Sequence, residues 1–556
     1  MKTTSRALLA RTSLAAAATL VLAAAPVQAF ELDTGNPDLS VRWDNTPRIN
    51  LGMRTEQRND LIGNNQLYDE GDYAFDRGDM VAERIDWLSE LDVIYKKRFG
   101  GRISAQAWYD AAYGSYGRSN PNFAAIASNP DNKYPDYIRD LYRGADAEIL
   151  DAFVFGRFDV GTVPLSVKLG RHTQYWGESL FVNGNLNSIA YSQNPLDLQK
   201  GFATPGAEAK ELFRPLNQIS AQAELTDELT VMAQYYFEWD SFRYPEGGTF
   251  LGPVDFAFRG PSRQFLGQAL GFATNGGNIN PDEMGDWGIG ARWSPQWLDG
   301  TLGFYYRNYS DKLPQVLLTR VGPGASQYNL VYGDNISLFG LSLAKNIAGL
   351  SLGAELSYRS NTPLNAVVLG NAAAAGVLPG GETAGPRGNT ANGLVNLLGV
   401  LPKTALFDAG TWATELVWAH LVSVRSGANL FMGEGYAACA GKTKWDGCST
   451  SNYFGLSAAF TPIWYQVFPG VDLSMPMAVY SGLSGNAPTI FAGNQGNGNF
   501  AIGLGADVYQ KYRIDLKYID YFGHTTDNGT MVTAQNGFTS LLKDRGSVYL
   551  TFKTTF

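Results

Sequence analysis

The sequence is poor in the residues that form most catalytic and metal centres. Its 556 residues include two cysteines and three histidines, namely Cys439, Cys448, His172, His420 and His524. Because no His, Cys and carboxylate residues cluster at the spacing of metal ligands, we expect neither a metal site nor a cofactor. A lipid or ester hydrolase, which we keep as an alternative, would need a histidine in contact with an activated serine. Ser179 follows His172 by seven residues, and that spacing gives no reason to expect contact.

The sequence also lacks an excess of positive charge and, beyond residue 29, any long apolar run. Residues 1–29 have the pattern of a signal peptide, with Lys2, Arg6 and Arg11 before a short apolar segment and a small-x-small site at 27–29. Removing these three basic residues would take the formal net charge from −9 to −12, which argues against a nucleic-acid partner. No later segment is long enough for a spanning helix, so an exported chain of this kind would enter a membrane as a closed β-barrel.

Glycine, aromatic residues and period-two alternation are what the sequence does contain. It has 63 Gly, 29 Tyr, 30 Phe and 12 Trp, with 17% charged residues and a mean hydropathy of −0.16. At the end of the chain, Val548 and Leu550 fall on one face of a predicted strand and Tyr549 and Thr551 on the other. This strand, ending in Phe556, resembles those of bacterial outer-membrane β-barrels, whose insertion machinery recognises such a residue. The competing interpretations are an edge strand of a β-sandwich and a large secreted β-rich enzyme.

Strand-like segments come in pairs joined by tight turns, with long loops between the pairs, as is typical of a transmembrane barrel. Tight turns are predicted near 99–101, 161–162, 226–228, 299–300, 348–349, 426–427, 469–470 and 509–510. Long loops are predicted at about 59–83, 115–146, 178–214, 241–285, 312–335, 362–410, 438–450, 483–497 and 524–543. We therefore predict an all-β, antiparallel transmembrane barrel over residues 47–556 with about 18 strands, or 16 as second choice. The first strand runs from about 48 to 58, and residues 30–46 form a periplasmic tail or enter the barrel mouth.

The parity of each predicted strand divides its side chains between lipid and lumen. In the segment 84–110, apolar residues such as Trp87 and Ile103 alternate with charged ones, so we expect a wet or ligand-lined interior. The predicted lumen-lining residues are Arg84, Asp86, Glu90, Arg102, Trp108, Asp110, Lys168, His172, Gln174, Trp176, Arg307 and Lys517.

The loop at 178–214 is long and mixed in polarity, which favours folding into the lumen as a constriction or plug. A surface loop held by its own ion pairs is the alternative. The charged residues assigned to the constriction are Glu178, Asp197, Lys200, Lys210, Glu211 and Arg214. In an oxidising compartment, Cys439 and Cys448 should form a disulfide within another loop.

Two loop regions are more apolar than exposure to solvent would favour. They are 250–258 with 265–272, and 366–378 with 394–401. Such patches usually mark a binding or membrane-contact surface, and here they would collect a lipophilic solute or pack on each other as a lid.

Several motifs resemble one proteobacterial family, catalogued as domain of unknown function 1302. They are FEL at 30–32, RWDNT at 42–46, AWYDA at 107–111, GRHTQYWGES at 170–179, AYSQ at 190–193, KELFRP at 210–215 and QYYFEW at 234–239. The resemblance covers nearly the whole mature chain and implies an outer-membrane location in a Gram-negative bacterium. Proteins of that family are often encoded beside resistance-nodulation-division transporters and a periplasmic lipid-carrier-like protein, so the resemblance implies these as partners in moving hydrophobic molecules across the envelope. It brings no catalytic residues.

These observations favour a channel over an enzyme. The expected function is passive or gated transport of hydrophobic or amphipathic small molecules, lipid-like or aromatic, by a barrel surrounded by outer-membrane lipid. The alternatives are an accessory of an efflux or lipid-transport system without a pore of its own and, less favoured, the hydrolase.

Overall fold

The wall of the molecule is one antiparallel sheet that closes on itself. The computed structural model describes residues 30–204, 207, 209–372, 374 and 384–556, and the predicted signal peptide lies outside this part of the chain. Among the described residues, twenty strands share this sheet, whose edges meet where Arg48–Arg54 pair with Ser547–Lys553. β1 is a short strip on the edge of β2, and β21 and β22 are two halves of one strand, so the closed wall has 18 strands. The predicted fold and strand number are confirmed.

The wall strands differ in length, from 7 residues in β11 (Trp287–Trp293) to 18 residues in β19 (Ala409–Ser426) among the undivided strands. They are β2 (Leu39–Arg54), β3 (Met80–Tyr95), β4 (Phe99–Asp110), β5 (Gly144–Val160), β6 (Val163–His172), β7 (Leu216–Thr226), β8 (Leu229–Tyr236), β11 (Trp287–Trp293), β12 (Gly300–Tyr309), β15 (Ile336–Ile347), β16 (Leu350–Pro363), β18 (Arg387–Leu401), β19 (Ala409–Ser426), β20 (Asn452–Phe468), β21 (Val471–Ser474), β22 (Met477–Ser484), β23 (Gly498–Val508), β24 (Tyr512–Phe522) and β27 (Ser547–Thr554), with β1 at Phe30–Leu32.

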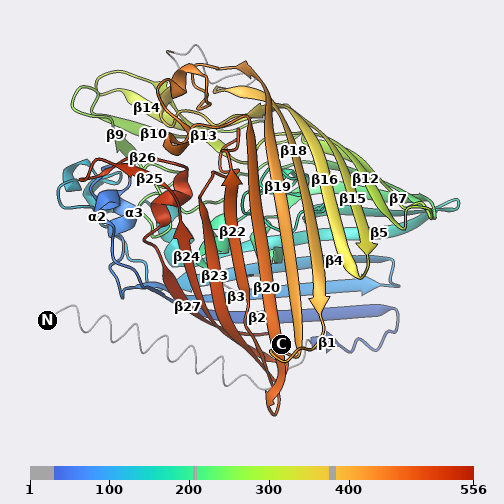
Figure 1. Cartoon of the computed structure of the whole chain (residues 1–556). Coiled ribbons are helices and arrows are strands. Elements are labelled where there is room, and N and C mark those ends of the chain that lie inside the picture. Colours follow the sequence, from blue (N-terminus) through green and yellow to red (C-terminus); the bar gives the residue numbers. More distant parts are fainter. Residues whose placement is uncertain (1–29, 205–206, 208, 373, 375–383) are drawn as a thin grey trace.

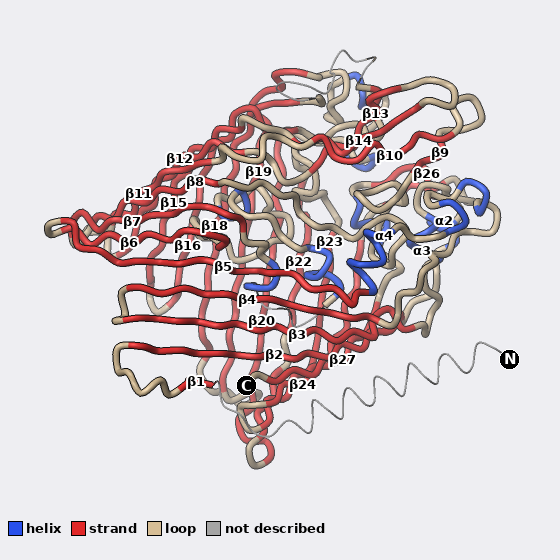
Figure 2. Tube along the Cα trace, turned by 180° about the vertical axis from the view of Figure 1, so that it is seen from behind, coloured by secondary structure: helices blue, strands red, loops and turns tan. Residues whose placement is uncertain are grey.

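Short turns join the strands at one end of the barrel, called the turn end, and long loops join them at the other, called the loop end (Figures 1 and 2). The loops carry β9 (Arg263–Phe265), β10 (Phe272–Ile279), β13 (Pro314–Arg320), β14 (Ser326–Tyr332), β17 (Gly370–Asn371), β25 (Thr525–Asp527) and β26 (Val532–Gln535). They also carry α2 (Asp60–Gly63), α3 (Asp69–Tyr73), α4 (Asp136–Ile138), α5 (Leu198–Ala203), α6 (Ala209–Leu212), η1 (Ala124–Ile126), η2 (Pro130–Asn132), η3 (Arg139–Arg143), η4 (Ala190–Ser192), η5 (Ala437–Cys439), η6 (Lys444–Asp446) and η7 (Phe538–Leu542). In the described part of the chain, no helix has both the length and the apolar character needed to cross a membrane.

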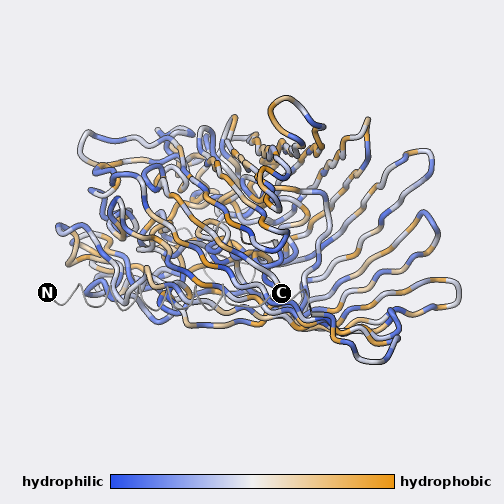
Figure 3. The backbone as a smooth tube through the Cα atoms, turned by 90° about the horizontal axis from the view of Figure 1, so that it is seen from below, coloured by the Kyte–Doolittle hydropathy of each residue, from blue (hydrophilic) through white to orange (hydrophobic). Residues whose placement is uncertain are grey.

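Side chains alternate between an apolar outer face and a polar inner face. On β27, Leu550 is 44% exposed on the outside, whereas Tyr549 and Thr551 are 2% exposed on the inside. On β3, Trp87 faces outward and Arg84 is buried inward. Figure 3 shows hydrophobic and hydrophilic segments alternating along the hairpins that fan out from the loops. The outer face therefore has the apolar character that lipid requires, as the strand parity predicts.

Two predicted connections are wrong in position. The predicted loop at 362–410 contains β18 and a short turn at 402–408, and the predicted turn at 426–427 instead begins a long loop. The first half of β18 contains Gly and Asn, which are common in loops. The second half, residues 394–401, is the stretch that we predict to be part of an apolar loop. In the structure, Val395 is instead exposed on the outside of the wall, whereas Leu398 and Val400 share the inward parity of Asn396 and are exposed toward the lumen. The strand number is unchanged because one predicted strand is lost where another is gained.

The first wall strand begins at Leu39 rather than near Arg48, so Pro47 lies inside it. Asn45 exchanges both backbone hydrogen bonds with Phe556, at 2.7 and 3.0 Å. In an antiparallel sheet, residues two apart in a strand form their backbone hydrogen bonds with the same neighbouring strand. The N–H that Pro47 lacks would therefore have pointed toward β27, near the C-terminal end of β27. Residues 30–32 pair with Val41–Trp43, so this part of the N-terminal segment extends the wall.

Cys439 and Cys448 form a disulfide in the loop 427–451, with 6.1 Å between their Cα atoms. The bridge encloses a short segment in a region with only short 3-10 helical turns, so much of the order of this loop depends on it. Reduction should lower the stability of the loop by roughly 2–3 kcal/mol and leave the barrel closed. Limited proteolysis should then show faster cleavage within 427–451 alone. Equal cleavage rates in oxidised and reduced protein would contradict this expectation.

Candidate functional site

A segment of the chain crosses the barrel lumen and is fixed to opposite walls. This plug segment, residues 173–215, connects β6 to β7 and carries η4, α5 and α6. It contacts inward-facing residues of β2 on one side of the wall and of β16 and β19 on the other, which places it inside the barrel. The plug predicted at 178–214 therefore lies in the lumen rather than on the surface.

Two buried glutamates on one wall hold the first part of the plug segment by its backbone. The Glu415 carboxylate on β19 accepts hydrogen bonds from the Leu180 N–H at 2.7 Å and the Phe181 N–H at 3.3 Å. The Glu355 carboxylate on β16 accepts from the N–H groups of Glu178, Ser179 and Ile189, the last two at 3.2 and 3.0 Å. Both carboxylates are buried, and charge-assisted bonds of this kind are among the stronger ones in proteins.

The opposite wall holds the second part of the plug segment by side-chain ion pairs. Arg48 on β2 donates two hydrogen bonds of 2.8 Å to the carboxylate of Glu211. The Lys210 ammonium pairs with Glu90 on β3, and the Lys200 ammonium donates to Gln106 on β4. Since Arg48 and Glu211 are both at most 3% exposed, this contact is a desolvated salt bridge.

Contacts between these two anchors fill the middle of the lumen. Trp176 stacks on Tyr305 of β12 with 5.8 Å between ring centroids. Arg307 on the same strand donates to the Ser192 side chain at 3.0 Å, and Arg359 on β16 donates to the Ser188 carbonyl at 2.9 Å. The plug segment is thus fixed along its length.

The interior at this level is packed, which corrects the prediction of a wet interior. The predicted lumen residues Arg84, Asp86, Glu90, Trp108, Asp110, His172, Trp176 and Arg307 are all buried. Toward the turn end the inner wall opens. The side chain of Arg102 is 33% exposed there, Lys168 is exposed and Lys517 is half-buried. The lumen is therefore filled near the loop end and open to solvent near the turn end.

The other predicted residues of the plug segment contact the wall, a neighbouring loop or the segment itself. Glu178 accepts from the Ser342 hydroxyl on β15 at 3.2 Å. Asp197 caps α5 by accepting from the Lys200 N–H at 2.8 Å. Arg214 donates to the Ser241 carbonyl at 2.8 Å, and the backbone of Gln174, which is half-buried, donates to Asn194.

His172 and Ser179 do not form a catalytic pair. The His172 ring nitrogens lie 2.9 Å from the Gly170 carbonyl and 2.8 Å from the Ser220 hydroxyl. The Ser179 hydroxyl instead bonds with Asn185 and lies 3.5 Å from Glu415. A hydrolase would need the histidine to act as base toward the serine, and this geometry does not provide that contact.

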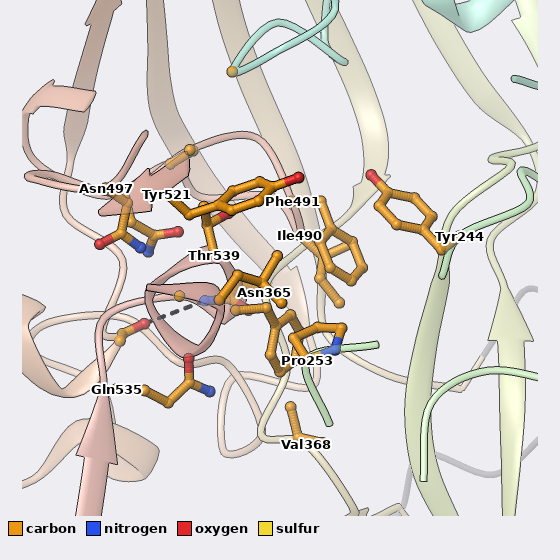
Figure 4. A pocket seen from close by; sticks show the side chains of 18 of the residues that line it. Tyr244, Pro253, Asn365, Val368, Ile490, Phe491, Asn497, Tyr521, Gln535 and Thr539 are labelled. Carbon is orange, nitrogen blue, oxygen red and sulfur yellow. Dashed lines mark hydrogen bonds between the residues drawn. The ribbon is translucent and has the colours of Figure 1, made fainter. Parts of the chain in front are cut away.

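A cavity of about 550 Å³ with a mixed lining of apolar, aromatic and polar side chains lies among the loops at the loop end (Figure 4). Leu186, Leu198 and Phe202 of the plug segment line it, so they form a boundary between cavity and lumen. The apolar stretches predicted at 250–258 and 366–378 both contribute lining residues, whereas residues 373 and 375–378 lie outside the described chain. The volume falls within the usual range for small-molecule sites.

Sequence reasoning missed the anchors Glu355, Glu415, Arg48 and Arg359. Glu355 and Glu415 are each the only acidic residue of their strand and have inward parity. A single acidic residue in a strand, with lumen-facing parity, is a signal that would have identified both.

At the loop end, three buried carboxyl groups join separate loops. Asp255 accepts from the Glu70 N–H at 3.1 Å, and Glu70 accepts from the Ser128 hydroxyl at 2.6 Å. Burial raises the pKa of Asp69 to about 6 and that of Glu70 to about 7, although Arg263 opposes the shift at Glu70, and the pKa of Asp255 is also raised.

This cluster predicts that the loops dock more tightly in acid. Because the docked state binds more protons than the undocked state between pH about 4 and about 7, docking is strongest below that window and weakens as pH rises through it. Amide exchange around Asp69 and Asp255, corrected for intrinsic rates, should be slower at pH about 5 than at about 8. Glu70→Gln should reduce the difference, and equal protection of the wild type at both pH values would contradict the account.

The fold and the site together define a transmembrane β-barrel whose lumen is crossed by its own chain. The chain belongs to the family described as "Protein of unknown function (DUF1302)", which matches residues 10–556. The resemblance seen in the sequence motifs is thereby confirmed. No protein with a curated description matches the sequence.

Several solved outer-membrane proteins are similar in structure at low sequence identity. Pseudomonas aeruginosa OpdK with vanillate has 11% identity and a TM-score of 0.40, covering 93% of this chain and 98% of that one. Acinetobacter baumannii OccAB3 has 11% identity and a TM-score of 0.42, covering 93% and 99%. A BenF-like porin from Pseudomonas fluorescens Pf-5 has 10% identity and a TM-score of 0.40, covering 95% and 100%. TM-scores near 0.4 are too low to transfer any property to this chain.

Proposed function

We propose that this protein is a gated outer-membrane channel for hydrophobic or amphipathic small molecules, lipid-like or aromatic. In this proposal the loop end faces the exterior and the turn end faces the periplasm, as is usual for barrels with long loops on one side. A solute would collect in the cavity and pass into the lumen when the plug segment is displaced. It would then leave through the open part of the lumen at the turn end.

The observation that carries the proposal is the shared boundary between cavity and plug. Leu186 and Leu198 line the cavity, while Glu178 and Glu211 of the same segment are held by the wall. A solute in the cavity would therefore contact the element that closes the lumen. Binding energy that favours a displaced plug would shift the balance between closed and open states.

The anchors are compatible with a gate because they are polar and separate. Each contact to the wall through Glu355, Glu415 or Arg48 is a discrete set of hydrogen bonds that can be exchanged for water. Such exchange costs less than separating a continuous apolar interface, because water replaces the lost partners.

A filled lumen also supports a second candidate, an accessory of an efflux or lipid-transport system without a pore of its own. Its partners would be a resistance-nodulation-division transporter and a periplasmic lipid-carrier-like protein. In that case the barrel would not conduct, and it would copurify with envelope transporters.

Uptake of a labelled panel of lipophilic solutes would separate these functions. The panel would be compared in cells lacking the protein, cells with wild type, and cells in which residues 178–214 are shortened. The channel proposal expects faster uptake of some compounds with wild type and an altered selection with the shortened plug. Uptake that never depends on the protein would overturn it, and copurification would then test the accessory.

A further inference from the structure

We propose that the loop-end cavity is a binding site for uncharged, flat, oxygenated molecules rather than for plain hydrocarbons or for anions. The inference rests on the proposed function and names the solute class of that site. It follows from which groups line the cavity and which of them lack partners.

One side of the cavity is a continuous aromatic surface. Tyr244 stacks on Phe491 with 4.6 Å between ring centroids and on Phe258 with 5.2 Å. Phe538 lies 5.2 Å from Phe491. All four residues line the cavity, and stacked rings of this kind present faces that suit a flat ring system.

The polar groups of the cavity are tyrosine hydroxyls together with asparagine, glutamine and threonine side chains. Tyr68, Tyr244 and Tyr521 all line it, and within the described residues none of their hydroxyls has a hydrogen-bond partner. In Figure 4 the hydroxyls of Tyr521 and Tyr244 are directed toward the space between the two rings. They come from β24 and from the loop between β8 and β11, on opposite sides of that space.

Unpartnered hydroxyls make the site selective. A hydrocarbon that displaces water from them leaves each without a partner, which is unfavourable for a polar group. A molecule with a hydroxyl or carbonyl group can replace that water. The cavity should therefore favour oxygenated ring systems over the parent hydrocarbons.

Charge is scarce along this surface. Of the lining residues, all in the described part of the chain, Lys442 and Asp446 alone carry charge. Asp446 accepts hydrogen bonds from Thr443, and Lys442 is exposed. An anion buried against the aromatic surface would find no buried cation there, so a carboxylate should bind poorly.

The lipid-facing side of the barrel provides an internal comparison. A hollow over β7, β8, β11, β12 and β15 is lined by apolar residues that include Ala221, Ala233, Ile289, Phe304 and Leu341. Burial of apolar surface would favour binding of a hydrocarbon in this hollow, and a hydroxyl group would add no favourable interaction there. Binding to the outer wall would thus show the opposite preference from binding in the cavity.

The test uses three fluorescent probes that share one ring system: 1-hydroxypyrene, pyrene and pyrene-1-carboxylate. Their binding to the full barrel in amphipol would be followed by fluorescence polarisation at a slightly acidic pH that keeps the phenol neutral, with empty amphipol as blank. The proposal expects 1-hydroxypyrene to bind more tightly than the other two. Tyr244→Phe and Tyr521→Phe should each weaken that probe by about threefold to tenfold and leave pyrene unchanged.

Tyr235→Phe is the matched control, because Tyr235 is an exposed tyrosine of β8 on the outer face. Equal affinity for pyrene and 1-hydroxypyrene, or no change in Tyr244→Phe and Tyr521→Phe, would overturn the inference. Since the measurement needs no transport, selective binding without protein-dependent uptake would overturn the channel proposal alone. Protein-dependent uptake without selective binding would overturn this inference alone.

Discussion

Replacing Glu415 with Gln should convert a largely closed barrel into a frequently open one. Both Glu415 oxygens accept hydrogen bonds, from Leu180 and Phe181 of the plug segment and from the side chains of Asn185 and Asn396. A glutamine at this position keeps one acceptor oxygen but carries no negative charge. Its NH2 group would replace the other acceptor oxygen and face groups that are themselves hydrogen-bond donors. Losing charge-assisted bonds of about 1.5–3 kcal/mol each should raise the open fraction by roughly tenfold to a hundredfold.

Single-channel recording in planar bilayers would measure this effect. Asp515→Asn is the matched control, because Asp515 on β24 faces the lumen and bonds with Arg513 rather than with the plug segment. The control should conduct like wild type. If Glu415→Gln also stays closed while the protein remains folded, Glu415 does not hold the gate.

The ion pair between Arg48 and Glu211 predicts the second large effect, which should reverse in a double variant. Arg48→Met removes the two hydrogen bonds that Glu211 accepts from Arg48, and Glu211→Leu removes the same two bonds while Asp86 still lies 3.5 Å from the guanidinium. Each single change should destabilise the docked plug segment by about 3–5 kcal/mol, because it removes one partner of a buried ion pair. The double variant should restore much of the lost stability, since an apolar pair replaces a desolvated ion pair.

Amide exchange of residues 209–214, measured in wild type, both single variants and the double variant, would give the coupling between the two positions. A favourable interaction in the double-mutant cycle is expected. Additive losses, with the double variant worst of all, would show that the pair does not act as a unit.

The barrel was predictable because its signal is repeated in most wall strands. Trp87 and Ile103 face lipid and Arg84 and Asp110 face inward, as parity alone requires. β18 escaped prediction because its Gly- and Asn-containing start has the composition of a loop. Local composition and periodicity conflict there, and the pairing with β16 and β19 decides the outcome.

The position of the plug segment was predictable, but its contacts were not. Lys200, Lys210 and Glu211 were assigned to a constriction from loop length and charge alone. Their partners lie on β2, β3 and β4, more than ninety residues earlier in the chain, so no local pattern connects them. For the same reason the charged rows of the first hairpin suggested a wet interior, whereas the plug segment buries them.

Transport with the plug segment covalently locked tests the gate most directly. A variant with Arg48→Cys and Glu211→Cys would carry two thiols where two side chains now meet, and wild type has no free cysteine. A cleavable thiol crosslinker of matching length would join β2 to the plug segment, and wild type treated alike is the control. The account predicts that solute flux into proteoliposomes stops on crosslinking and returns on cleavage. Flux that continues unchanged through the locked barrel would contradict a gate formed by this segment.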